Sequence, residues 1–235
     1  MDDDVNNVNM KAGAAGRSAH RERYHHGNLR HALIETARLL VEARGALDLS
    51  LREVAKQTEV SPASVYRHFT DKSALLAAVA AEGFAELNAA FDRALAARRT
   101  LPAGDRLRAI GEAYVGFALE HPNLYRLMFA SGRCDTAADP ALEREAERAF
   151  RSLEAATAGT LAPDVWPSAA AGRAAEAKAV AARAVAAWSL VHGYVLLRLA
   201  GRLDCLPTEF LPDTVQVLTA LSMDPAAPAS TVDRT

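Results

Sequence analysis

Residues 50–72, SLREVAKQTEVSPASVYRHFTDK, contain two helix starts separated by a short corner. Ser50 can cap a first helix, and Glu53 follows three residues later, at the spacing of a capping box. Ser61 followed by Pro62 is a second start signal, because serine is a favourable N-cap and proline suits the first helical position. The interval leaves room for two helical turns and a corner of about three or four residues. This spacing is typical of a helix-turn-helix, whose second helix enters a DNA major groove.

The second of these helices has an inward and an outward face. Val65 and Phe69 are four residues apart and are expected to pack inward, with Val60 closing the corner. Arginine can bond a guanine edge or a phosphate, and serine, tyrosine and histidine often reach phosphates. The pattern favours DNA binding, although a solvated amphipathic helix in an ordinary helical domain would have the same pattern. The outward residues and those at the helix start are Ser61, Ala63, Ser64, Tyr66, Arg67 and His68.

Residues 24–84 resemble the DNA-binding domain of the TetR (tetracycline-repressor) family of transcriptional regulators. The segment YHHGNLRHALIETARLLVEARG is similar to the basic lead-in and first helix of that domain. The segment LSLREVAKQTEVSPASVYRHFTDKSALL is similar to its helix-turn-helix and the start of its fourth helix. The resemblance implies that Lys72 holds a DNA phosphate and that Arg52 contacts the DNA backbone or a groove. Ser50 is a weaker candidate for a phosphate contact.

The second half of the chain resembles a C-terminal domain found within the same family. Residues 187–193, AWSLVHG, look like the signature of the WHG-type domain, and residues 121–129, HPNLYRLMF, resemble an upstream segment of it. The resemblance implies an all-α protein, in which an N-terminal three-helix helix-turn-helix domain is joined by a long helix to a C-terminal helical domain. In this family the C-terminal domain binds a small-molecule inducer and forms the dimer.

Composition and proline positions suggest the boundaries along the chain. The polar tails 1–23 and 224–235 are expected to be disordered. The DNA-binding domain is assigned to residues 24–84 and the ligand-binding and dimerisation domain to residues 85–223. No stretch alternates with period two, so strands are not expected. After a long helix from Lys72 to about residue 98, helices are expected near 104–120, 122–131, 139–160, 168–200 and 207–221.

The family pattern is broken at the corner of the helix-turn-helix. Family members usually carry Ala-Gly there, and this chain carries Thr58-Glu59. If Glu59 takes the left-handed conformation that glycine supplies, the strain is about 1–2 kcal/mol. If the corner has a different geometry, Glu59 has a negative φ and no strain.

The distribution of charge matters more than its total. The chain has 235 residues and a formal charge of −2, which by itself argues against a nucleic-acid partner. Between Arg17 and Lys72, however, the chain has ten lysines and arginines and only seven acidic residues. Five of its seven histidines also lie there. The start lacks the basic and apolar regions of a signal peptide, and no apolar stretch of about 18 residues is free of charge. A cytoplasmic protein is therefore expected, with Cys134 and Cys205 as reduced thiols.

The second half offers no catalytic motif. It lacks a glycine-rich phosphate loop, a supported Ser/His/Asp set and the CxxC or HExxH spacing of metal sites, so no enzyme activity, metal or cofactor is expected. It does carry aromatic side chains with polar tips, which suit a mostly apolar ligand pocket. Plain core packing is the competing interpretation, above all for the isolated histidine. The residues expected near a pocket are Tyr114, Phe117, Met128, Trp188 and His192.

The two last expected helices, 168–200 and 207–221, have more apolar residues than one bundle needs. The resemblance implies that they pair across a two-fold axis into a four-helix bundle. The sequence therefore predicts a ligand-responsive homodimeric repressor that binds a palindromic, double-stranded DNA operator and no membrane. Two alternatives remain: a sequence-tolerant DNA-organising protein without an inducer, and an enzyme or carrier on a helical scaffold.

Overall fold

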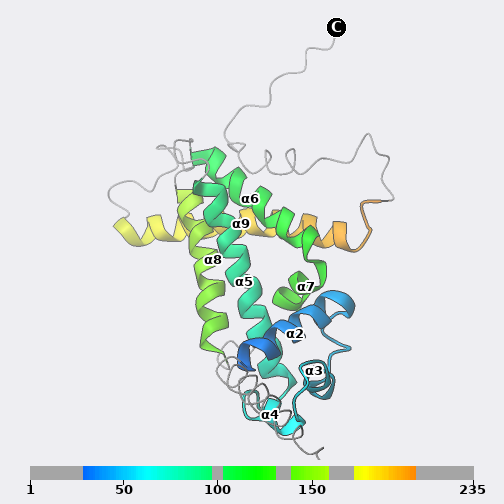
Figure 1. Cartoon of the computed structure of the whole chain (residues 1–235). Helices are drawn as coiled ribbons and strands as arrows, with labels where there is room; N and C mark the ends of the chain where they lie inside the picture. The colour runs from blue at the N-terminus through cyan, green and yellow to red at the C-terminus, as the bar shows by residue number, and fades with distance from the viewer. Residues whose placement is uncertain (1–28, 97–102, 131–138, 159–171, 205–235) are drawn as a thin grey trace, which may run out of the picture. The chain divides into compact units, whose positions relative to one another are not determined.

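The computed structural model describes residues 29–96, 103–130, 139–158 and 172–204 (Figure 1). These residues form helices α2 to α9 and contain no strand, which confirms the predicted all-α class. The chain divides into two compact units between Val79 and Ala80. The predicted tails and the helix expected at 207–221 lie outside the described residues.

The first unit is built from α2 (Leu29–Arg44), α3 (Leu51–Gln57), α4 (Pro62–Tyr66) and the start of α5 (Lys72–Ala96). Val65 and Phe69, which were predicted to pack inward, are buried in its core, and Val60 at the corner is half-buried. α2 ends at Gly45, whose φ of +86° is in the left-handed region and whose amide donates to Val41 O at 2.7 Å. The core of this unit also includes apolar residues at helical spacing on α2 and α3, which are Leu33, Ala37, Leu40, Val41, Leu51, Val54 and Ala55.

Side-chain caps start three of these helices, and the caps at Ser50 and Ser61 confirm the prediction. Ser50 Oγ accepts from the Glu53 amide at 3.2 Å, and Ser61 Oγ accepts from the Ser64 amide at 3.2 Å. Asp71 Oδ1 accepts from the amide of the third residue beyond it at 2.8 Å and so caps α5. Each cap satisfies an amide that has no partner within its own helix. The helix starts are therefore local consequences of the sequence.

The corner between α3 and α4 has the left-handed geometry. Glu59 has φ +57°, and it is the one non-glycine residue with positive φ in the described part of the chain. Its amide donates to Lys56 O at 3.2 Å, and the Val60 amide donates to Ala55 O at 2.9 Å. This pair of bonds is a Schellman motif, which needs a left-handed residue at the position after the cap. Glu59 thus occupies a place that favours glycine.

Thr58, the other departure at this corner, ties two helices together. Its Oγ1 lies 2.8 Å from Val54 O and 3.2 Å from Thr36 Oγ1. The Thr58 hydroxyl has one proton, which it can donate to the Val54 carbonyl. The hydroxyl of Thr36 on α2 can then donate to Thr58 Oγ1. A polar contact therefore joins α2 to the end of α3 where the family usually has alanine.

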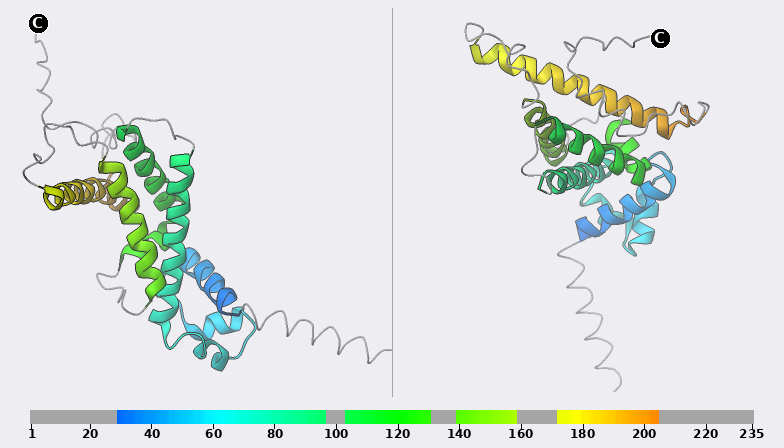
Figure 2. Two further views of the ribbon diagram at one scale, coloured as in Figure 1. Left: turned by 90° about the vertical axis from the view of Figure 1, so that its left-hand side faces the viewer. Right: turned by 90° about the horizontal axis from the view of Figure 1, so that it is seen from above.

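The second unit contains the rest of α5, with α6 (Ala103–Glu120), α7 (Pro122–Ala130), α8 (Pro140–Ala158) and α9 (Gly172–Leu199). These bounds agree with the expected helices to within a few residues. α6, α8 and α9 pack against one another, and α9 runs across α8 along one side (Figures 1 and 2).

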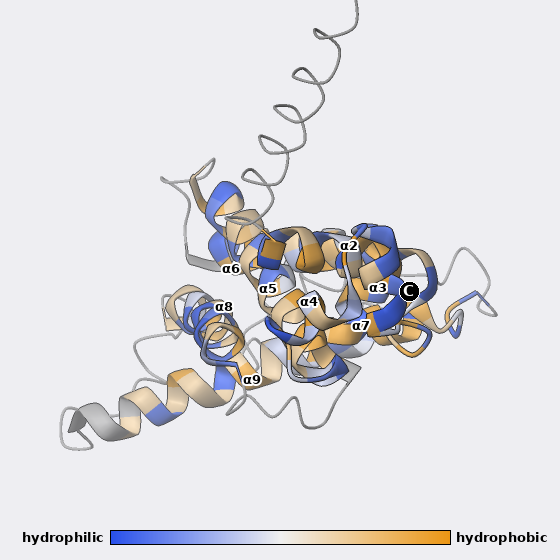
Figure 3. Cartoon of the chain, turned by 60° about the horizontal axis from the view of Figure 1, so that its bottom comes forward, coloured by the Kyte–Doolittle hydropathy of each residue, from blue (hydrophilic) through white to orange (hydrophobic). Residues whose placement is uncertain are grey.

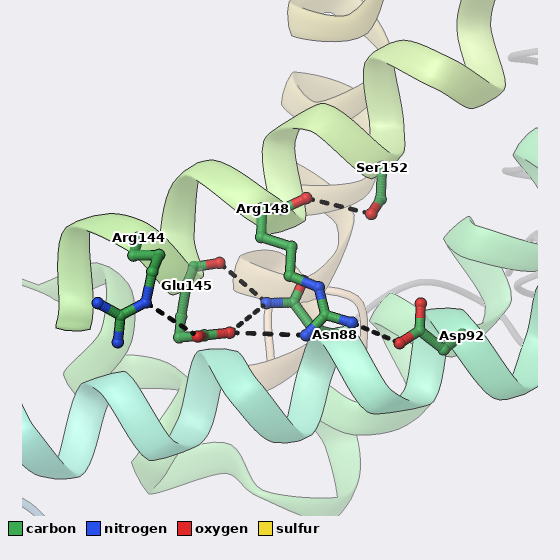
Figure 4. A network of polar contacts seen from close by, with 6 residues as sticks. All are labelled: Asn88, Asp92, Arg144, Glu145, Arg148 and Ser152. Carbon is green, nitrogen blue, oxygen red and sulfur yellow. Dashed lines mark hydrogen bonds and ion pairs between the residues drawn. The ribbon is translucent and has the colours of Figure 1, made fainter.

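A buried amide joins α5 to α8 (Figure 4). Asn88 is 1% exposed, and its Nδ2 donates to Glu145 O at 2.9 Å and to Glu145 Oε2 at 3.2 Å. Arg148, one turn further along α8, pairs with Asp92 of α5 at 2.6 Å. Asn88 Oδ1 is buried without a hydrogen-bond donor among the described residues. These contacts set the register of the two helices.

Two helices are long and apolar enough, by length and composition, to cross a membrane: α5 and residues 177–199 of α9. More than half of the apolar window of α5 is buried, as in the core helix of a soluble protein. Only 22% of the window of α9 is buried, and this helix is predominantly apolar along its length (Figure 3). Its exposed large side chains are Val185, Leu190, Leu196 and Leu197.

Candidate functional sites

The first candidate site is the outward face of α4. Val65 and Phe69 are buried, which turns Ala63, Tyr66 and Arg67 outward. Tyr66 is 54% exposed despite its aromatic ring. Among the described residues, neither the Arg67 guanidinium nor the His68 ring, which is also exposed, has a hydrogen bond or ion pair. These groups are available to a partner of opposite charge or with hydrogen-bond acceptors.

The start of α4 is organised by two serines. Ser61 is exposed and Ser64 is half-buried, and their hydroxyl oxygens lie 2.8 Å apart. Ser61 Oγ also accepts from the Ser64 amide, so its proton is free to be donated outward or to Ser64. The pair holds one hydroxyl donor at the helix N-terminus, where the helix dipole favours an anion.

Cationic side chains flank α4 on both neighbouring helices. Lys72 opens α5, is half-buried, and its Nζ donates to Leu47 O at 2.8 Å in the loop before α3. An ammonium group has three donors, so this bond fixes the position of the charge and leaves two donors. Arg52 is exposed on the first turn of α3, next to the cap Ser50. Every residue predicted to contact DNA is thus at least partly exposed and lies on α3, on α4, at the start of α5 or in the residues directly flanking α3 and α4.

The second candidate site is a cavity of about 190 Å³ inside the second unit. All five helices of that unit contribute to its wall. Within the described residues no charged side chain lines it. The lining residues are Phe84, Leu87, Phe91, Leu107, Ile110, Gly111, Tyr114, Phe129, Ala146, Ala149, Phe150, Leu153, Ala187, Trp188 and Val191.

Among the described lining residues only two side chains carry a polar atom, and these two atoms are hydrogen-bonded to each other. Trp188 Nε1 donates to Tyr114 Oη at 3.2 Å. Tyr114 Oη also lies 2.9 Å from Tyr125 Oη and 2.9 Å from His192 Nδ1, and the last two atoms are 2.7 Å apart. We call Tyr114, Tyr125, Trp188 and His192 the polar cluster. Two of its members, Tyr114 and Trp188, belong to the otherwise apolar wall of the cavity.

The polar cluster has more contacts than protons. With the imidazole proton on Nε2 of His192, the two phenols supply two protons for three mutual contacts. With the proton on Nδ1, that nitrogen can no longer accept, and again at most two of the three contacts are hydrogen bonds. The Tyr114 hydroxyl therefore has a choice of acceptors within the cluster.

Burial keeps the polar cluster uncharged. It raises the pKa of Tyr114 to about 12, and it raises the pKa of Tyr125, on which the neighbouring Tyr114 acts in the same direction. Burial lowers the pKa of His192, because the protonated ring loses hydration. At neutral pH the cluster therefore consists of two phenols, an indole and a neutral imidazole.

Two family models match the chain. Residues 33–79 match bacterial regulatory proteins of the tetR family, and residues 107–220 match the tetracyclin repressor-like C-terminal domain. The chain belongs to the TetR family. Members of this family are DNA-binding transcriptional regulators, and the helix-turn-helix of the first unit is the part that binds DNA. No curated protein gave a significant match.

Solved structures resemble this TetR-family regulator over most of its length. A protein of unknown function from Rhodococcus sp. RHA1 is 31% identical, with a TM-score of 0.65, and the match covers 85% of this chain and 94% of that one. A tetR-family transcriptional regulator from Streptomyces coelicolor is 22% identical, with a TM-score of 0.55 and coverage of 82% and 76%. The transcriptional regulator FadR from Bacillus subtilis, in complex with stearoyl-CoA, is 11% identical, with a TM-score of 0.57 and coverage of 82% and 95%. The last two share the fold.

Not all residues predicted near a pocket in this TetR-family regulator line the cavity. Tyr114 and Trp188 line it, and His192 joins it through the polar cluster. Phe117 instead packs against the ring of His121, with centroids 5.1 Å apart. Met128 fills the space over a glycine of α5: a Cβ on Gly83 would lie 2.7 Å from Met128 Sδ.

Sequence reasoning also missed part of the wall of this TetR-family regulator. Phe129 of α7 lines the cavity and packs against the polar cluster, with its ring centroid 5.0 Å from that of His192, and Tyr125, one turn before it, belongs to that cluster. The α8 residues recur at helical spacing, which is a signal that could have identified that face. They are Ala146, Ala149, Phe150 and Leu153.

Proposed function

We propose that this TetR-family regulator is a ligand-responsive homodimeric repressor that binds a palindromic DNA operator. The observation that carries the proposal is the division of α4 and the three residues after it, which buries Val65 and Phe69 and leaves Tyr66, Arg67 and His68 exposed, with no hydrogen bond or ion pair to the described residues. A short helix with this division can lie in a major groove, with its small residue Ala63 allowing close approach.

The groups around α4 receive distinct roles in this proposal. Arg67 reads a base edge, because its guanidinium is exposed at the end of the recognition helix. Lys72, held by Leu47 O, binds a phosphate together with Arg52. Side-chain hydroxyls and the imidazole add further backbone contacts. Those supporting groups are Ser50, Ser61, Ser64, Tyr66 and His68.

A second copy of the chain covers the exposed apolar face of α9 in this proposal. Leu196 and Leu197 are 45% and 47% exposed, and Val185 and Leu190 are similarly uncovered. Burying such side chains against an equal face stabilises a two-fold dimer. A dimer also presents two recognition helices about 34–36 Å apart, which suits a palindrome with half-sites one helical turn apart. The protein would act in the cytoplasm, where its operator lies.

The cavity is the proposed inducer site, in a C-terminal domain of the WHG type. α5 contains both Lys72 and the cavity residue Phe84, so the DNA-binding and ligand-binding groups share a helix. A ligand shifts the regulator towards a conformation that does not fit the operator only by its differential affinity for the two conformations.

Selection of bound sequences from a random DNA pool, at moderate salt, tests the proposal. A palindromic motif supports a dimeric, specific regulator and supplies a probe for inducer screening. Salt-dependent binding without a motif would favour the DNA-organising protein instead. If the protein binds no DNA at all, the proposal is wrong.

A further inference from the structure

The lining of the cavity is apolar, and this limits the class of ligand that the cavity can bind. Its wall is made of aliphatic and aromatic side chains, and no described lining residue is charged. The two polar atoms of the wall belong to Tyr114 and Trp188, and they bond to each other. A carboxylate, phosphate or ammonium group inside would lose its hydration without gaining a partner of opposite charge, which is strongly unfavourable.

The polar cluster offers one hydrogen-bonding position to a ligand. The Tyr114 hydroxyl has two alternative acceptors, Tyr125 Oη and His192 Nδ1, and the three contacts hold at most two protons. Tyr114 can therefore give up one of these contacts to a ligand hydroxyl while it keeps another. The Trp188 bond to Tyr114, at 3.2 Å, is the longest in the cluster. The site can therefore accommodate a single neutral polar group of the ligand beside the Tyr114 hydroxyl.

The volume of the cavity sets the ligand size. An apolar cavity of about 150 Å³ accepts benzene. The cavity here measures about 190 Å³, so a substituted single ring or a short branched hydrocarbon fits without rearrangement.

We infer that the inducer site, on the proposed function above, takes a compact, uncharged and mainly hydrocarbon ligand with at most one hydrogen-bonding group, which meets Tyr114. Charged analogues of the same shape are rejected. The specificity resides in the lack of a counter-charge among the described lining residues and in the two polar side chains of the wall, Tyr114 and Trp188.

Three probes of nearly equal shape test this inference: toluene, benzyl alcohol and benzoate. Binding is measured on the full chain without DNA, by ligand-observed NMR and by the shift in melting temperature at pH 7.5. Saturable binding of toluene and benzyl alcohol is expected, with benzoate at least about 100-fold weaker. Benzoate binding as tight as benzyl alcohol would overturn the inference, as would failure of both neutral probes to bind.

Variants then locate the binding. Ala149→Leu fills the cavity from α8 and should abolish binding of both neutral probes, whereas Ala155→Leu, exposed on the same helix, should leave it unchanged. If Ala149→Leu does not fold, Ala146→Leu on the same wall replaces it. Tyr114→Phe should lower the affinity ratio of benzyl alcohol to toluene by about 2- to 10-fold. Unchanged binding in the filled variant, or an unchanged ratio in Tyr114→Phe, would overturn the inference.

These measurements do not depend on DNA, so they separate the ligand class from the proposed function. Neutral probes that bind the cavity but do not release a selected operator leave the ligand class standing and contradict the ligand-responsive role. If benzoate binds more tightly than the neutral probes, the inferred ligand class is wrong. If the same protein still binds its operator, the DNA-binding role is unaffected.

Discussion

The amide of Val60 donates to the carbonyl of Ala55 across 2.9 Å, and this bond closes the end of α3 around Glu59. The same two-bond motif ends α9, where Arg202 donates to Leu197 O at 2.9 Å around Gly201. The enclosed residues have φ +57° and +64°. One motif therefore holds a glycine, and the other holds a side chain that pays a steric penalty for the same backbone.

Glu59→Gly should raise the free energy of unfolding by about 0.5–1 kcal/mol. Relief of the left-handed strain contributes about 1–2 kcal/mol, and the greater freedom of glycine in the unfolded chain removes part of it. Glu59→Ala is the control, because it removes the charge but retains a Cβ at positive φ, and it should give no such gain. Urea unfolding of the three proteins measures the difference, and a gain in the alanine variant would show that charge is responsible.

Arg67→Ala and Lys72→Ala should weaken DNA binding in different ways. Loss of Arg67 should cost about 1–3 kcal/mol on the selected operator and little on random DNA, if this residue reads a base. Loss of Lys72 should weaken binding to all sequences alike and lower the salt slope by about one. Fluorescence anisotropy over a salt series measures both effects.

Lys178→Ala, on α9, is the control for a change in net charge alone and should leave both affinities unchanged. Because Lys72 also bonds Leu47 O, the melting temperature of its variant must be checked before binding is compared. Equal effects of Arg67→Ala and Lys72→Ala on specific and random DNA would contradict the separation of roles.

The double substitution Leu190→Glu and Leu197→Glu on α9 should convert the proposed dimer into monomers. Burying four carboxylates across a two-fold interface is unfavourable, since each loses hydration next to like charges. Sedimentation velocity should show half the mass, and operator affinity should fall because the two half-sites are no longer read together. Leu119→Glu on α6, also at an exposed leucine, should leave the mass unchanged. A dimer that persists in the double variant would place the interface elsewhere.

The stability of the second unit should fall in mildly acidic solution through His192. Burial lowers the pKa of His192 below the ordinary histidine value of 6.5, so near and below that pH the unfolded chain binds more protons than the folded chain. The contribution of His192 to stability is complete above pH 6.5 and is lost as the pH falls towards the lowered folded pKa. His192→Asn removes the titrating group.

Urea unfolding between pH 5 and 8 checks this prediction. The difference in unfolding free energy between wild type and His192→Asn should shrink as the pH falls, because only the wild type loses this contribution. The other histidines are present in both proteins and cancel in the comparison. A difference that is constant over the whole range would contradict a lowered pKa at His192.

Local chemistry in the sequence was enough to predict most of the helices. The caps at Ser50, Ser61 and Asp71 depend on hydrogen bonds to amides three residues away, and proline marks other helix starts for equally local reasons. The buried stripe of α2 follows from helical periodicity alone. The family resemblance, and with it the DNA-binding class, rests on the same contiguous stretches. These features need no knowledge of distant contacts.

Tertiary structure decided the cavity and the conformation of the corner. His192 lies 78 residues from Tyr114 and 67 from Tyr125, so their hydrogen bonds follow from how α6, α7 and α9 pack and from no local pattern. Phe117 and Met128 are apolar like the residues that line the cavity, but the packing of their helices directs them against His121 and Gly83 instead. The sign of φ at Glu59 was open because a left-handed glutamate is locally unfavourable. It is held there by the bond from Val60 to Ala55 and by the burial of Val65 and Phe69 beyond it.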